Sequence, residues 1–180
     1  MNAQEAKPAI SLQERVTHEV PEPEVNVAQG PQFSNLETVF LQGTIEGLTG
    51  VDISRGVGWK HGSQVVDIRR TLALRFRVNP QDNRLTKAVT TAYLCRAIMA
   101  AVDAKVLNTS HLPEKAKEPL DQVETEVLEG ITDGENIFDL SKRLGVDMDR
   151  GTEHLNKICE KFGVKNIFMA AACWANGIRN

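Results

Sequence analysis

Apolar and polar residues alternate along 64–78, and this alternation predicts a β-strand. Three arginines, Arg69, Arg75 and Arg77, fall on one face of the extended chain, while the opposite face is largely apolar. A proline after the pattern ends it, because proline donates no ladder hydrogen bond. A similar alternation over 36–48 predicts a second strand. The glycine-dense segment that follows is typical of tight turns between antiparallel strands or of a flexible loop.

Over 83–107 the apolar residues recur every three or four positions, which predicts a helix. From Ala88 to Val102 the only charged residue is Arg96, so this helix is apolar almost all round and should be buried. The apolar run is shorter than the ~18–20 residues that span a membrane. We therefore expect an α+β fold, in which a short antiparallel sheet of strands 36–48 and 64–78 packs on a helical body around this central helix.

Further helices are expected in the C-terminal half of the chain. Residues 120–130 have the spacing of an amphipathic helix with an acidic, solvated outer face formed by Asp121, Glu124, Glu126 and Glu129. Three shorter helices are predicted over 137–144, 153–162 and 167–175, two of them ended by a glycine.

Residues 1–32 differ in composition from the rest of the chain. They contain four prolines and several glutamates, and their valines form no helical stripe. Such a segment buries too little apolar area to offset the entropy of ordering it. We expect an N-terminal arm over 1–32, either disordered or ordered on a neighbouring subunit, and a single α+β domain over 33–180.

Two sets of residues are candidates for contacts with other proteins. Trp59, Lys60 and His61 place an aromatic side chain beside two groups that can carry positive charge, within the glycine-dense segment. Arg69, Arg75 and Arg77 would project together from the strand predicted over 64–78. Their carboxylate partners could belong to another subunit or to the chain's own acidic helix, and the sequence leaves both possibilities open.

The segment 139–158 resembles a helix-turn-helix. The resemblance rests on Leu140 and Leu144, followed directly by Gly145 and Val146, and implies that Lys142, Arg143 and Arg150 would contact nucleic acid. The segment departs from the pattern at Gly151, where an apolar anchor is expected. Its acidic residues Asp147, Asp149 and Glu153 would be repelled by phosphates. A net charge of −3 also shows no general basic excess.

No motif for catalysis, metal binding or nucleotide binding is present in the sequence. The four histidines and three cysteines are scattered, without HExxH, GxSxG or CxxC spacing, and no phosphate-binding glycine loop occurs. We expect no catalytic residues, metal or cofactor, and no small-molecule ligand. Without a signal peptide or a spanning segment, the protein should be cytoplasmic.

The expected function is therefore that of a non-enzymatic structural or interaction protein. Its partners would be copies of itself or other subunits of a larger assembly, such as a phage or virus particle or a bacterial multiprotein machine. A small DNA-associated regulator is the second hypothesis, and an enzyme of unknown class is the third.

Overall fold

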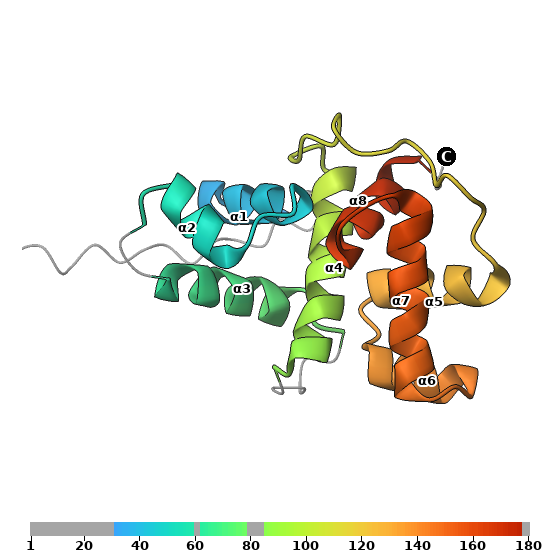
Figure 1. The fold of residues 1–180 in the computed structure, drawn as a ribbon. Coiled ribbons are helices and arrows are strands. Elements are labelled where there is room, and N and C mark those ends of the chain that lie inside the picture. Colours follow the sequence, from blue (N-terminus) through green and yellow to red (C-terminus); the bar gives the residue numbers. More distant parts are fainter. Residues whose placement is uncertain (1–30, 60–61, 79–84, 178–180) are drawn as a thin grey trace, which may run out of the picture.

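The computed structural model describes residues 31–59, 62–78 and 85–177, and every regular element within these ranges is a helix. The order is α1 (Asn35–Ile45), α2 (Gly50–Gly56), α3 (Ser63–Arg75), α4 (Lys87–Asp103), α5 (Gln122–Thr132), α6 (Ile137–Leu144), α7 (Met148–Phe162) and α8 (Ile167–Gly177). Helix α4 runs through the middle, with α1–α3 on one side and α5–α8 on the other (Figure 1). Of the arm expected over 1–32, residues 1–30 lie outside the described ranges.

Helix α4 is the buried central helix that the apolar pattern predicts. Thr86 caps it by accepting a hydrogen bond from the backbone N–H of Val89. Leu94 and Ile98 are almost inaccessible to solvent, and the small residues of α8 let that helix pack closely against α4. The helix ends at Asp103, so it is shorter at both ends than the predicted range 83–107. Positions 83 and 84 lie outside the described residues.

The strand predicted over 36–48 is wrong, because this segment is mainly helix α1. Ser34 and Glu37 form a capping box at its N-terminus: the Ser34 side chain accepts from the Glu37 N–H, and the Glu37 carboxylate accepts from the Ser34 N–H. Two of the otherwise unpaired backbone N–H groups of the first turn are thereby satisfied. This local signal favours a helix over the alternation read from the side chains.

The strand predicted over 64–78 is also wrong, because residues 63–75 form helix α3. Val65 and Leu72 are buried, and Ile68 and Phe76 are partly buried against the same core. These four positions are spaced by three or four residues, so they also fit one helical face. Because the described residues contain no strand, the α+β class and its antiparallel sheet are corrected to an all-helical fold.

The glycine-dense segment contains a short helix, α2, rather than only turns or loop. Thr49 and Asp52 form its capping box. Gly43 of α1 lets α2 approach closely, since a Cβ at this position would lie 2.6 Å from Cγ1 of Ile53. Helices α1 and α2 therefore pack as a corner against α3 (Figure 1), and α1 also contacts α8.

Helices α5–α8 lie close to their predicted ranges, with two corrections. Helix α7 begins at Met148, capped by Asp147, rather than near Glu153. Glu124, expected on a solvated face of α5, is buried and paired with Lys161 of α7. Among the residues that the structure describes, no helix is both long and apolar enough to cross a membrane.

Candidate protein-interaction surfaces

The first predicted contact set is only partly described. Trp59 is half-buried and packs against the hydrophobic core, and its carbonyl oxygen accepts a hydrogen bond from Ser54. Lys60 and His61 lie outside the described residues. The role of this set in binding stays a prediction.

The three arginines do not share one face, because the segment that carries them is helical. Arg69 and Arg75 are six residues apart, which turns a helix by about 240°, and Arg77 lies beyond the end of α3. The Nη1 atom of Arg75 lies 2.9 Å from Oε1 of the buried Glu37. The same guanidinium lies 5.1 Å from the ring centroids of Phe33 and Phe76. Arg75 therefore ties α3 to α1 within the chain, not to the acidic helix α5.

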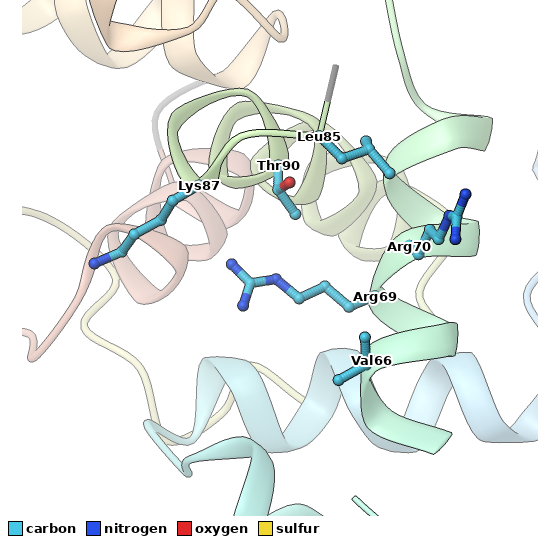
Figure 2. Close-up of a pocket in the computed structure, with 6 residues that line it drawn as sticks. All are labelled: Val66, Arg69, Arg70, Leu85, Lys87 and Thr90. Carbon is cyan, nitrogen blue, oxygen red and sulfur yellow. The ribbon is translucent and has the colours of Figure 1, made fainter. Parts of the chain in front are cut away.

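Arg69 instead lies in an open groove between α3 and the first turns of α4 (Figure 2). The groove has a volume of about 460 Å³. It is lined by Val66, Arg69, Arg70, Leu85, Lys87 and Thr90. In Figure 2 the Arg69 side chain extends across the space toward α4, with Arg70 and Lys87 at its two sides. We call this surface the basic groove.

The charges of the basic groove are not compensated by the side chains that line it. Arg69, Arg70 and Lys87 are cationic, and none of the described residues that line the groove is acidic. Among the described residues, none of these three side chains forms an ion pair. The Nε atom of Arg69 is buried without a hydrogen-bond partner. Because three cations line the groove without carboxylate partners among the described residues, the groove is suited to receive an anionic group.

An apolar groove of about 270 Å³ lies between α1 and α2. The exposed side chains of Val39, Leu48 and Val57 line it, together with the acidic residues Glu46 and Asp52. Neither groove is predicted from the sequence, and one reason accounts for both. Each is built between helices where a strand or a glycine loop was expected, so the side chains that meet were assigned to different faces.

In the segment that resembles a helix-turn-helix, α6 and α7 are joined by a short turn. Gly145 ends α6 in the left-handed region, with a φ of 67°. Gly151, which departs from the helix-turn-helix pattern, is buried, and a Cβ added there would collide with the hydroxyl of Ser141. The absence of a side chain at Gly151 thus allows the two helices to pack closely.

The three residues that this resemblance assigns to nucleic acid differ in their surroundings. Arg143 donates from Nε and Nη2 to both carboxylate oxygens of Glu135, at 2.9–3.1 Å. Lys142 and Arg150 are exposed. Arg150 follows the acidic N-cap Asp147, so the structure does not gather the three residues into an uncompensated basic surface.

The described part of the chain bears on two kinds of reactive centre, a metal centre and a cysteine nucleophile. It contains no group of three or more histidine, cysteine or acidic residues that could hold a metal ion. Burial raises the pKa of Cys159 and of Cys173 to about 11, so both thiols are protonated at neutral pH. Burial also raises the pKa of Cys95. None of the three is activated as a nucleophile.

Comparisons with protein families, curated proteins and solved structures found no significant match to this chain. Its function is therefore inferred from the surfaces described above.

Proposed function

We propose that this chain is a non-enzymatic interaction protein, a subunit of a larger protein assembly built in the cytoplasm, and that its basic groove binds an acidic segment of protein. The observation that carries this proposal is the set of three cations, Arg69, Arg70 and Lys87, which line one open groove whose described wall contains no acidic residue. By contrast, Arg75, which lies outside the groove, is paired with the carboxylate of Glu37.

The groove offers more than charge. Val66 is 63% exposed at its edge, and Leu85 lines it beside the cations. An acidic segment that also carries small apolar side chains could therefore bury apolar area while its carboxylates pair with the arginines. A free inorganic anion would use only the charges. This combination favours a protein segment as the ligand.

The proposal can be tested with a labelled peptide of alternating glutamate and valine, by fluorescence anisotropy on the full chain. The double variant Arg70→Glu/Lys87→Glu should weaken binding at least about tenfold, since each reversal replaces an attraction by a repulsion. Both side chains lie at the sides of the groove, and Lys87 is the first residue of α4, where a glutamate is compatible with the helix.

The matched control is Lys115→Glu/Arg150→Glu, which changes the net charge by the same amount at two exposed residues outside the groove. It should bind the peptide like the unmodified chain. Equal weakening in both variants would mean that net charge alone matters. Absence of peptide binding both to the unmodified chain and to its variant Glu22→Gln/Glu24→Gln would refute the proposed function.

DNA binding through α6 and α7 is a second candidate, favoured by the short turn between them with its left-handed Gly145. The acidic residues Asp147, Asp149 and Glu153 weigh against it. Titration of a short duplex at two salt concentrations tests it. Salt-dependent binding that Arg150→Glu abolishes would support DNA binding.

A further inference from the structure

We propose that the basic groove is occupied by the chain's own N-terminal segment, residues 19–25, which has the sequence Glu-Val-Pro-Glu-Pro-Glu-Val. This inference rests on the proposed function, since it names the acidic segment that the groove binds. The segment carries three carboxylates, at Glu19, Glu22 and Glu24, and two valines. It therefore offers both kinds of group that the groove can use.

The charges match in number and sign. The described wall of the groove supplies three cations and no carboxylate, and the segment supplies three carboxylates and no cation. The segment contains no basic residue between Glu19 and Val25, whereas Lys7 and Arg15 interrupt the earlier part of the chain. Pro21 and Pro23 exclude a regular helix over these residues, so the carboxylates can be presented along an extended backbone.

The groove is within reach of the same chain. The ring of Phe33 stacks on Phe76, with centroids 5.6 Å apart, so the described chain begins beside the C-terminal end of α3. From Phe33 back to Glu24 an extended chain spans up to about 30 Å. Along α3, Arg70 lies only about 9 Å from Phe76. The length of the intervening chain therefore permits binding without a second copy.

The guanidinium of Arg69 supplies a specific place for one carboxylate. Arg69 extends across the groove between α3 and α4 (Figure 2), and its Nε is buried and lacks a hydrogen-bond partner. A glutamate carboxylate in the groove would pair with the end of this guanidinium, in the two-bond geometry that arginine and carboxylate favour. The valines of the segment would then lie against Val66 and Leu85.

One test follows the segment directly, by its rate of cleavage with a glutamate-specific protease at the Glu24–Val25 bond. In the groove variant Arg70→Glu/Lys87→Glu the bond should be cut several-fold faster than in the unmodified chain. The charge-matched variant Lys115→Glu/Arg150→Glu should show the unmodified rate. Equal rates in all three proteins overturn the inference.

A second test uses the glutamate–valine peptide as a competitor. The variant Glu22→Gln/Glu24→Gln should bind this peptide at least about threefold more tightly, because the groove is then free for a larger fraction of the time. The control Glu5→Gln/Glu14→Gln removes the same charge from the same arm outside the segment. It should leave the affinity unchanged.

The outcomes separate this inference from the proposed function. If peptide binding depends on Arg70 and Lys87 but not on Glu22 and Glu24, the groove binds acidic segments and the segment 19–25 does not occupy it.

Protection of the Glu24–Val25 bond should not vary over a hundredfold range of protein concentration. Protection that appears only at high concentration would assign the segment to a neighbouring chain and refute binding within one chain. Duplex DNA binding that the groove variant abolishes, with no change in cleavage rate, would assign the groove to nucleic acid instead.

Discussion

The ion pair between Lys161 and Glu124 should be a major stabilising contact between α5 and α7. The Lys161 Nζ atom lies 2.6 Å from Oε2 of Glu124, and the Glu124 side chain is only 2% exposed. The same Nζ donates to the carbonyl of Pro119 at 3.0 Å, so it also holds the connector before α5. The Lys161→Met substitution keeps the aliphatic stem but leaves a buried carboxylate without its cation.

Removing one partner of a buried pair costs about 3–5 kcal/mol. The Lys161 side chain is 22% exposed, so water screens the pair in part. We therefore expect about 3 kcal/mol, at the lower end of that range. With an m value of about 2 kcal/mol per molar urea, the unfolding midpoint should fall by about 1.5 M. Urea unfolding followed by circular dichroism measures this shift.

A matched control lies one turn earlier on the same helix. Lys157 and Glu153 form a pair at 2.7 Å, but both side chains are about half exposed. Exposed pairs contribute little, because water screens them and ordering two long side chains costs entropy. Lys157→Met should leave the midpoint nearly unchanged. If Lys161→Met shifts the midpoint no more than Lys157→Met does, the reasoning about burial is refuted.

The double variant Glu124→Gln/Lys161→Met isolates the buried charge. A glutamine can still accept the hydrogen bond from the Asp121 N–H, which lies 2.8 Å from Oε2 of Glu124. Because no buried charge is then left without a partner, the double variant should recover about 1–2 kcal/mol relative to Lys161→Met. A further loss of stability would show that the lysine acts mainly through its packing.

Three further substitutions test the remaining contacts. Arg75→Glu would place a like charge beside the buried Glu37 and should lower Tm by a few degrees in a thermal melt. An unchanged Tm would show that the pair between Arg75 and Glu37 does not stabilise the fold. Ile98→Ala, at a position with no solvent exposure, should cost about 2–5 kcal/mol in urea unfolding, and a loss under about 0.5 kcal/mol would place α4 outside the core. Gly151→Ala should cost about 1–3 kcal/mol by overpacking, and adding Ser141→Ala should restore much of that loss, since the collision involves the serine hydroxyl. Failure of the second change to help would mean that the two helices separate rather than collide.

The basic groove shows what a one-dimensional pattern can and cannot predict about a site. The sequence singled out Arg69 as a contact residue, but grouped it with Arg75 and Arg77 on a strand face. Because the segment is a helix, Arg75 pairs with Glu37 and Arg69 lies beside Lys87, a residue from the next helix. No spacing within 64–78 could indicate Lys87, since its proximity depends on how α3 packs against α4.

The local sequence alone determines several features of the fold, whatever packs around them. The nearly uniform apolar character of 88–102 requires burial whatever surrounds it, because exposing such a surface to water is unfavourable. The C-terminal ends of α6 and α7 are also determined by the local sequence. Gly145 and Gly163 adopt positive φ, a conformation that glycine reaches without a steric penalty.

Tertiary packing decided the segments whose pattern allows two readings. Val65, Leu72 and Phe76 fit a helical stripe, while other apolar residues of the same segment alternate as in a strand, so local spacing could not choose between them. Burial against α1 and α4 selects the helix. The same holds for Glu124, which is charged and looks solvent-facing in sequence. Its burial depends on Lys161, 37 residues further on, which supplies the opposite charge at hydrogen-bond distance.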